Sequence, residues 1–323
     1  MSAAGRHIVV LAGGLSAERD VSLRSGRRLV TALREGGAEA TLADVDSALL
    51  PRLRELAPDC VIPVVHGPLG EDGALATLLE LTGFAYLGAR PDAARLAFDK
   101  PLAAARMAAA GVRVPRHLTL PQALLRDCGA QAVLDRALST IGLPCVVKPA
   151  WGGSALGVSI VVDREELPAA VVGAYTYAPT AMIEQYVDGV EVAVTIVDDG
   201  SVTVLPPVEI VPVTGWYDAN ARYTAGAVEF FAPARLTDAQ VAAVVDCARA
   251  AHTALGLRDL TRIDMILSDE GPHVLEATVA PGLTETSLTP LAIGAAGRQL
   301  GEIALSLVAS ALASGGRLLS RPY

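Results

Sequence analysis

Two carboxylates near the C-terminal end of the chain limit how this sequence can fold. The stretch "LTRIDMILSDEGPHVLEATVAPG" places apolar residues on both sides of the turn "SDEGP", which predicts a β-hairpin centred near Glu270. If its strands pair symmetrically, Asp264 lies opposite Glu276, and Arg262 lies opposite Thr278. The two-residue alternation of a strand puts these four side chains on one face. The other face would then carry Ile263, Met265, Leu275 and Ala277.

The opposed carboxylates need a positive partner, because like charges across a sheet repel and burying them unpaired costs several kcal/mol. A hard divalent cation is one solution, since Mg²⁺ takes one or two protein carboxylates and completes its shell with water and phosphate oxygens. The other solution is a structural cluster in which Arg262 neutralises both carboxylates, and the hairpin alone favours neither. A phosphate clamp favours the metal, and "KPAWGGSALG" supplies Lys148 beside glycines that let backbone N–H groups approach an anion.

The first 98 residues alternate between strand and helix patterns, which predicts a parallel sheet with helices on both faces. The expected strands are "HIVVLAGG", "EATLADVD" and "CVIPVVHG". Ligands bind such a sheet beyond the carboxyl ends of its strands, where "GGLSAER" and "HGPLGEDG" emerge. No GxGxxG pattern follows the first strand, so a dinucleotide site is not supported.

The pattern changes at "FDKPLAAARMAAAGVRVP", which predicts a helix and a proline-marked connection. The following "LPCVVKPAWGGSALGVSIVV" predicts a hairpin, without the helix that a Walker-type loop would need. We expect the strands "AMIEQYV" and "VEVAVTIV" to close a smaller domain near residue 190. The chain length favours two or three domains, and the changes of pattern place three, at residues 1–98, 99–191 and 192–323.

The composition favours a protein that acts on small molecules in a reducing compartment. A net charge of -9 and a pI near 5.1 argue against a nucleic-acid partner. The four cysteines show no CxxC spacing, and no export signal is evident, so we expect free thiols and a cytoplasmic location. The apolar "RQLGEIALSLVASALA" is interrupted by Arg298 and Glu302, which favours a core-facing helix over a membrane span.

A series of segments, in order along nearly the whole chain, resembles the D-alanine--D-alanine ligase family of ATP-grasp enzymes. They are "AGGLSAERDVSL", "VVHGPLGEDGAL", "FDKPLAA", "VVKPAWGGSALGVS", "MIEQYVDGVEV", "YDANARYTAG", "RIDMIL" and "LEATVAPGLTETSLTP". The first, second and last are the most specific, because other ATP-grasp ligases do not share them. The resemblance implies a three-domain ATP-grasp architecture of the α/β and α+β classes, with nucleotide bound between the central and C-terminal domains. It also implies a homodimer that uses ATP with Mg²⁺ or Mn²⁺.

The resemblance assigns the nucleotide and metal contacts residue by residue. The residues that would bind ATP are Lys100, Lys148, Gly153, Ser154, Glu184, Val187, Glu191 and Arg222. Those that would hold the metal are Asp264, Glu276 and Thr278.

The same resemblance implies contacts with two D-alanines. Glu18 and His66 would bind the ammonium side of the first D-alanine. Ser154 and Tyr223 would join Glu18 in a hydrogen-bonded set between domains. Arg262, Ser287 and Leu288 would bind the second D-alanine, while Arg262 and the backbone of Gly282 would stabilise the tetrahedral intermediate.

The implied activity is the ATP-dependent ligation of two D-alanines for peptidoglycan synthesis. ATP would phosphorylate a carboxylate, and the resulting acyl phosphate would be attacked by the second amine. The loop "YDANARYTAG", which carries Tyr223, would close over the site and exclude water. Two alternatives stay open: a diverged amino-acid ligase of a natural-product or resistance pathway, and a non-catalytic nucleotide-binding protein.

Several positions depart from the family pattern, and they cluster on the phosphate and metal side. Thr278 stands where the family usually has an asparagine ligand, and Ala155 stands where it has a second serine. Arg222 replaces the usual lysine before Tyr223, and Trp151 is unusual. The residues expected to contact D-alanine are retained.

Three of the assigned residues also have plain structural explanations. Glu18 could be a favourable charge at a helix start, His66 a satisfied core histidine, and Lys100 a solvated surface lysine. The positions of Glu18 and His66 after predicted strands favour ligand contact instead.

Overall fold

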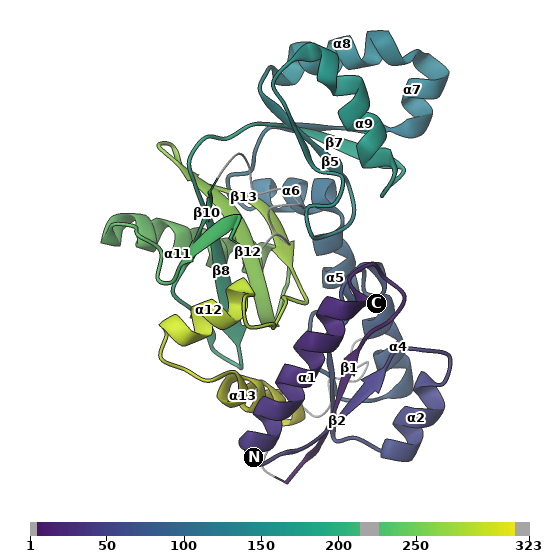
Figure 1. Cartoon of the computed structure of the whole chain (residues 1–323), viewed down its shortest axis with the longest axis vertical. Helices are drawn as coiled ribbons and strands as arrows, with labels where there is room; N and C mark the ends of the chain where they lie inside the picture. Colours follow the sequence, from purple (N-terminus) through teal and green to yellow (C-terminus); the bar gives the residue numbers. More distant parts are fainter. Residues whose placement is uncertain (1–4, 214–225, 314–323) are drawn as a thin grey trace.

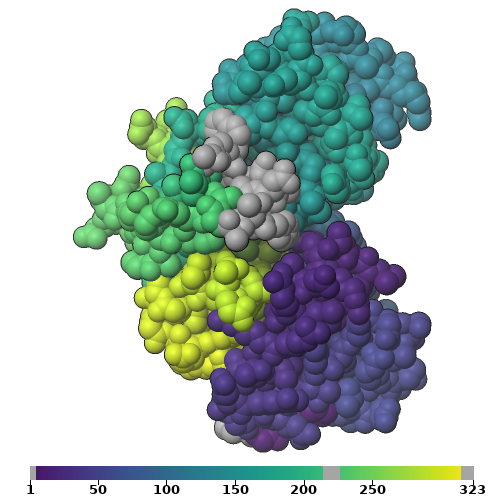
Figure 2. Space-filling view, viewed as in Figure 1, coloured from purple at the N-terminus to yellow at the C-terminus, as the bar shows by residue number. Residues whose placement is uncertain are grey.

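The structure is a computed structural model that describes residues 5–213 and 226–313, and these residues form three units, each built on one sheet (Figure 1). In Figure 2 the N-terminal unit, in purple, lies below the central unit, in teal, and beside the green and yellow C-terminal unit. The three-domain architecture that the resemblance implies is therefore confirmed. The predicted boundaries at residues 98 and 191 stay a prediction.

The N-terminal unit is the parallel α/β arrangement that the sequence predicts, with strand order β2-β1-β3. Alternate residues of the central strand face opposite layers: Ile8 and Val10 pack under α1, whereas Val9 and Leu11 pack under α2 and α4. The elements are β1 (His7–Ala12), α1 (Arg19–Glu35), β2 (Glu39–Asp44), α2 (Leu49–Leu56), β3 (Cys60–Pro63), α3 (Pro68–Glu71) and α4 (Ala74–Thr82).

Helix α1 is held close to the sheet where it begins. A Cβ atom added to Gly26 would lie 2.7 Å from Cβ of Ala12, so only glycine permits this approach. Ser22 accepts a hydrogen bond from the Gly13 N–H at 2.8 Å and donates one to the Val64 carbonyl at 2.6 Å. These contacts fix the start of α1 at the carboxyl ends of two strands.

The central unit is an antiparallel sheet with strand order β4-β7-β5-β6, preceded by two helices. The hairpin predicted around the glycine-rich turn is confirmed, because Cys145 pairs with Val161. In sequence order the elements are α5 (Pro91–Phe98), α6 (Lys100–Ala109), β4 (His117–Pro121), α7 (Gln122–Cys128), α8 (Ala130–Ile141), β5 (Cys145–Pro149), β6 (Ser159–Val161), the 3₁₀ turn Arg164–Glu166, α9 (Leu167–Tyr175) and β7 (Thr180–Gln185).

The C-terminal unit is a larger sheet with strand order β11-β10-β8-β12-β13, and β9 pairs with β8. The expectation that "VEVAVTIV" closes the smaller domain is wrong, because this segment is β8 and pairs with β10 and β12. Its residues 192–197 are all buried, as befits an internal strand with both faces covered. The strands are β8 (Val190–Asp198), β9 (Val202–Val204), β10 (Val208–Pro212), β11 (Val228–Phe231), β12 (Asp259–Ser268) and β13 (Gly271–Thr278), and the helices are α11 (Asp238–Ala254), α12 (Leu288–Ala295) and α13 (Leu300–Ala313).

The N- and C-terminal units share one hydrophobic core, whereas the central sheet has a separate one. One core combines Ile8 and Leu29 of the N-terminal unit with Ala193 and Ile303 of the C-terminal unit. The sheet of the central unit encloses a core of its own, which includes Val147 and Ile183, whereas α5 and α6 pack into a core with the C-terminal sheet. The N- and C-terminal units are thus packed together through apolar side chains.

The last helix faces the shared core, as its sequence pattern predicts, because Ile303, Leu307 and Val308 are buried there. Among the residues that the structure describes, no single helix is long and apolar enough to cross a membrane. Helices α12 and α13 reach that length and composition only as a pair bent by 97°.

Candidate active site

The carboxylate hairpin has the predicted register at its functional end. Asp264 pairs with Glu276, and Arg262 pairs with Thr278. The register then shifts, so that Met265 lies opposite Val274 and β13 contains one extra residue, as in a β-bulge. The prediction for Leu275 is therefore wrong: Val274 enters the core, and Leu275 lines a large cavity beside Glu276.

Each carboxylate of the hairpin has a cationic partner. Arg262 forms two hydrogen bonds of 2.7 Å with the two oxygens of Asp264, and it also donates to Oγ1 of Thr278 at 3.3 Å. Nζ of Lys100 lies 3.3 Å from Oε2 of Glu276. Lys100 comes from α6, far away in sequence, so the hairpin pattern could not indicate this partner.

The same carboxylates form a donor set that fits Mg²⁺. Asp264 and Glu276 project from adjacent strands and both line the cavity, so they offer hard oxygen donors side by side. Within residues 5–213 and 226–313, no cluster of three or more His, Cys, Asp or Glu side chains could hold a metal. A metal here would take two carboxylates and complete its shell with phosphate and water oxygens.

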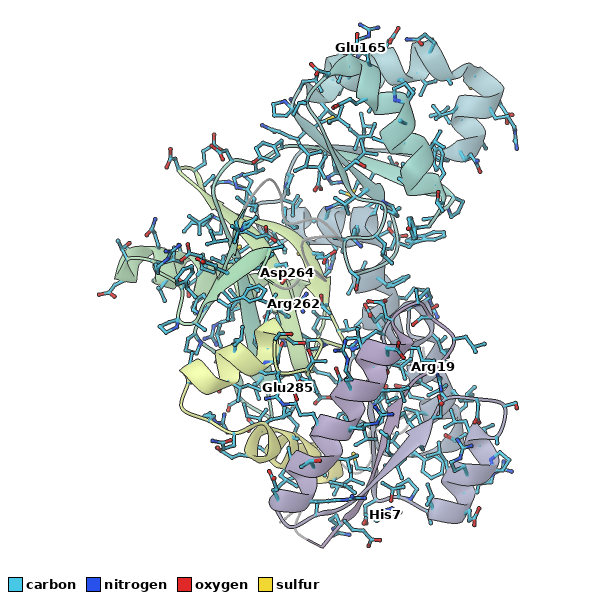
Figure 3. The ribbon with its side chains drawn as sticks, viewed as in Figure 1. His7, Arg19, Glu165, Arg262, Asp264 and Glu285 are labelled. Atoms are coloured by element: carbon cyan, nitrogen blue, oxygen red, sulfur yellow. The ribbon has the colours of Figure 1, made fainter. Side chains whose placement is uncertain are left out.

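A cavity of about 720 Å³ separates the central unit from the C-terminal sheet. This volume is within the range of nucleotide and drug-sized sites. Figure 3 shows Arg262 and Asp264 on the C-terminal sheet near the middle of the molecule, between the other two units. Among the residues predicted to bind ATP, those that line the cavity are Lys100, Lys148, Gly153, Glu184, Val187 and Glu191.

A buried ion pair lies in the wall of this cavity. Nζ of Lys148 lies 2.7 Å from Oε1 of Glu184, and both side chains are more than nine-tenths buried. Glu184 is paired with Val146 in the sheet register, which makes it the diagonal neighbour of Lys148 across strands β5 and β7. The ammonium group is thus held at the cavity by its own sheet.

The glycine-rich loop that follows Lys148 is tied to the start of α6. Lys100 donates from its backbone N–H to the Ala150 carbonyl at 3.0 Å, and its ammonium group donates to the Gly152 carbonyl. The indole of Trp151 donates to Asp99 at 2.8 Å. The unusual tryptophan therefore anchors the loop beside the cavity.

The loop also reaches the N-terminal unit. The Ser154 hydroxyl donates a hydrogen bond to Oε1 of Glu18, which is the contact between domains that the resemblance implies. Ser154 and Ala155 both have φ of +55°, a conformation that is uncommon for residues other than glycine. The other expected members of this region, Tyr223 and Arg222, lie outside the described residues.

His66 is buried but is not a fully satisfied core histidine. Its ring hydrogen-bonds to the backbone of Ala280, whereas Nε2 has no partner among the described residues. Burial lowers the pKa of the His66 imidazole, against the opposing influence of Glu18. A neutral ring that bonds through Nδ1 leaves the Nε2 lone pair free to accept a hydrogen bond from an ammonium group.

Glu71, to which neither the sequence pattern nor the family resemblance assigns a role, belongs to the same site. It accepts a hydrogen bond from the Gly67 N–H at 2.9 Å, and a Cβ atom added to Gly153 would lie 3.9 Å from its Oε2. Burial, and then the nearby Glu18 carboxylate, raise the pKa of the Glu71 carboxyl to about 8. The signal for it was its place in "HGPLGEDG", directly after a strand that ends at the site.

The segment before α12 brings Gly282 and Ser287 together. The Thr284 N–H donates to Oγ of Ser287 at 3.1 Å, and the two hydroxyls of these residues are 2.7 Å apart. A Cβ atom added to Gly282 would lie 3.0 Å from Oγ of Ser287. Ser287 precedes α12 without capping it through its side chain, and Leu288 is the first residue of that helix. The hydroxyl thus faces the segment.

Comparison with known proteins gives one consistent family. Residues 107–309 match the family model described as "D-ala D-ala ligase C-terminus". A D-alanine--D-alanine ligase of Anaeromyxobacter dehalogenans is 40% identical over 287 residues, which cover 88% of this chain and 90% of that protein. A D-alanine--D-alanine ligase of Desulforudis audaxviator is 38% identical, over 94% of this chain and 97% of that protein.

Solved structures agree in fold. The D-alanine--D-alanine ligase from Bacillus anthracis complexed with ATP aligns with a TM-score of 0.81 and 24% identity, covering 96% of this chain and 98% of that chain. The VanG D-Ala:D-Ser ligase from Enterococcus faecalis aligns with a TM-score of 0.81 and 22% identity, covering 95% and 99%. At these identities the likeness concerns the fold alone.

Proposed function

The chain belongs to the D-alanine--D-alanine ligase family, and from that premise we propose that it joins two D-alanines while converting ATP to ADP and phosphate. The observation that carries the proposal is a nucleotide-sized cavity in which the Asp264–Glu276 pair faces Lys100 and Lys148. Glu18 of the N-terminal unit, which accepts a hydrogen bond from Ser154, would contact the amino-acid substrate.

ATP would occupy the cavity between the central and C-terminal units. Glu184, Val187 and Glu191 would line the adenosine part, and Lys100 and Lys148 would neutralise phosphate charge. Asp264 and Glu276 would hold Mg²⁺, which supplies further neutralisation of the phosphates when bound. Thr278, which already accepts a hydrogen bond from Arg262, would be a weaker third ligand.

The first D-alanine would be bound through its ammonium group, with its carboxylate toward the phosphates. Glu18 offers an anionic acceptor and His66 Nε2 a neutral one, so the two together suit a cation. A carboxylate oxygen then forms a bond to the γ-phosphorus while the bond to the β-phosphate oxygen breaks. The products of this step are ADP and an acyl phosphate.

The second D-alanine would attack the acyl phosphate. Its free amine forms a C–N bond at the carbonyl carbon, the C–O bond to phosphate breaks, and the amine loses a proton. Arg262 and the Gly282 N–H would donate hydrogen bonds to the oxyanion that develops. Ser287 and the N–H of Leu288 would hold the carboxylate of this substrate at the start of α12.

The biological setting is part of the same proposal. The dipeptide would serve peptidoglycan synthesis, and the enzyme would work in the cytoplasm as a homodimer. Family membership supports this setting, and the acidic composition is consistent with a small-molecule enzyme.

A second candidate is the ligation of D-alanine to a different acceptor. It is favoured by Thr278 and Ala155, at positions where the resemblance leads one to expect asparagine and serine. Both altered residues would lie on the phosphate side, however, whereas Glu18, His66 and Ser287 are retained for the amino-acid side. D-alanine as acceptor is therefore the simpler function.

The test is ADP release by the purified protein with ATP and Mg²⁺, first with D-alanine alone and then with pairs of D- and L-amino acids and hydroxy acids. We expect one ADP for each D-alanyl-D-alanine, identified by mass. Turnover only with another pair would establish the second candidate. No ADP release with any pair would contradict both.

A further inference from the structure

Helix α1 makes a direct contact with the segment assigned to the second amino acid. Nη1 of Arg28 donates hydrogen bonds of 2.9 Å to the carbonyls of both Leu283 and Thr284. These two residues lie between Gly282 and Ser287, and Figure 3 shows Glu285, which follows them, close to α1. A half-buried arginine of the N-terminal unit thus binds a backbone segment of the C-terminal unit.

A second side chain of α1 holds the same segment. Oγ of Ser25, which is fully buried, accepts a hydrogen bond from the Leu283 N–H at 3.1 Å. Ser25 and Arg28 are three residues apart and so lie on one face of the helix. Three consecutive peptide groups, from Gly282 to Glu285, are therefore held by α1.

The peptide between Leu283 and Thr284 transmits this contact to Ser287. In a planar trans peptide the carbonyl and the N–H point in opposite directions. With the Leu283 carbonyl bound by Arg28, the Thr284 N–H points away from α1 and donates to Oγ of Ser287 at 3.1 Å. The orientation of the Ser287 hydroxyl is thereby linked to Arg28.

We propose that Arg28 is a positioning residue that sets the affinity for the second amino acid by fixing the Leu283–Thr284 peptide and, through it, Ser287. The inference rests on the proposed function, in which Gly282 and Ser287 face that substrate. Arg28 itself contacts neither substrate in this account.

The test separates the two amino-acid sites with hydroxylamine. Excess hydroxylamine captures the acyl phosphate as a hydroxamate and has no carboxylate, so it does not need Ser287. Hydroxamate formation then reports binding of ATP and the first D-alanine, whereas dipeptide formation also reports the second D-alanine. Both are measured against D-alanine concentration.

Arg28→Ala should raise the D-alanine concentration for half-maximal dipeptide formation about tenfold, because a charged donor to two carbonyls is lost. The concentration for half-maximal hydroxamate formation should stay unchanged. Arg28→Lys should restore part of the loss. Arg27→Ala is the matched control, since Arg27 is exposed on the same helix and lines, with Arg28, a surface pocket between α1 and the helices α12 and α13.

Three outcomes overturn the inference: unchanged dipeptide kinetics in Arg28→Ala, equal losses in both assays, or the same loss in Arg27→Ala. If Arg28→Ala does not fold, as judged by circular dichroism, Arg28→Lys and Ser25→Ala are put through the same two assays, with the same outcomes. A wild-type protein that forms neither product would contradict the proposed function instead, which keeps the two failures distinct.

Discussion

The half of the site assigned to the amino acids is built on two units that share one hydrophobic core, whereas the half assigned to ATP lies between the C-terminal sheet and a central sheet that has a core of its own. Ile8 and Ile303 represent the shared core, and Val147 and Ile183 represent the separate core of the central unit. Among the described residues, the central unit approaches the amino-acid half through the Ser154–Glu18 hydrogen bond. The amino-acid half is thus the more firmly fixed of the two.

The two halves also differ in whether their polar side chains already have partners. In the nucleotide half Lys100 pairs with Glu276, and Lys148 pairs with Glu184. In the amino-acid half, by contrast, Nε2 of the buried His66 has no partner among the described residues. If the assignments hold, ATP binding would break ion pairs within the protein, whereas the first amino acid would meet a buried ring nitrogen that no described residue binds.

The largest expected effect is in Glu276→Ala. Removing this carboxylate should lower ATP turnover about a thousandfold while the fold stays intact, because the metal loses one of its two anionic donors. ADP release measures the loss, and circular dichroism checks the fold. A variant that keeps metal-dependent activity would contradict the assignment of Glu276 as a metal ligand. It would also contradict the assignment of this half of the site to ATP.

The next effect is in Lys148→Met. This change should reduce ATP turnover strongly and lower the free energy of unfolding by about 3 kcal/mol, because it leaves the Glu184 carboxylate buried without its cation. Chemical denaturation measures the stability. The double variant Lys148→Met/Glu184→Gln should regain stability without regaining turnover, and recovery of both would show that the pair has no role in ATP binding.

Glu71 lies between Glu18 and Gly153, where the two halves meet, and its raised pKa predicts how the stability of the protein depends on pH. Its folded pKa of about 8 exceeds the usual value of 4.5, so its contribution to stability is full below pH 4.5 and is lost as the pH rises to about 8. Glu71→Gln cannot ionise, so relative to wild type it should gain about 1–3 kcal/mol in unfolding free energy across this range. The exposed Glu55→Gln is the control. If the free energies of unfolding of Glu71→Gln and wild type changed in parallel with pH, the raised pKa of this carboxyl would be refuted.

The smallest effect is expected at the hydroxyl of Thr278. Thr278→Asn should lower the Mg²⁺ concentration for half-maximal activity a few-fold, because an amide carbonyl reaches further than a hydroxyl and is a better ligand. The measurement is a Mg²⁺ titration of ADP release at saturating ATP. An unchanged midpoint would place this side chain outside the metal's ligands.

The sequence was sufficient for what depends on local pattern. The turn "SDEGP" and the alternation around it predicted the pairing of Asp264 with Glu276, because hairpin register follows from the turn. The same alternation failed at Leu275, because a bulge adds a residue without changing the composition of the strand. The strand β8 was placed in the wrong sheet, since an apolar run shows burial but not its neighbours.

The contacts that complete the site could not be predicted from the sequence. The Lys100–Glu276 pair and the hydrogen bonds of Arg28 join residues more than 170 positions apart, and no spacing rule connects them. The link of Ser154 to Glu18 was expected only through family resemblance. Physical pattern thus indicated the elements, and the fold determined which of their residues meet.

The most direct test of the comparison is a crystal structure with the non-hydrolysable nucleotide AMP-PNP, Mg²⁺ and D-alanine. The nucleotide half should reorganise: Lys100, now 3.3 Å from Glu276, should bind a phosphate oxygen, and Asp264 and Glu276 should lie about 2.0–2.1 Å from the metal. In the amino-acid half, the hydrogen bonds of Arg28 to Leu283 and Thr284 should be unchanged, with the D-alanine ammonium group at Glu18 and His66. An intact Lys100–Glu276 pair with the phosphates bound elsewhere would contradict the account.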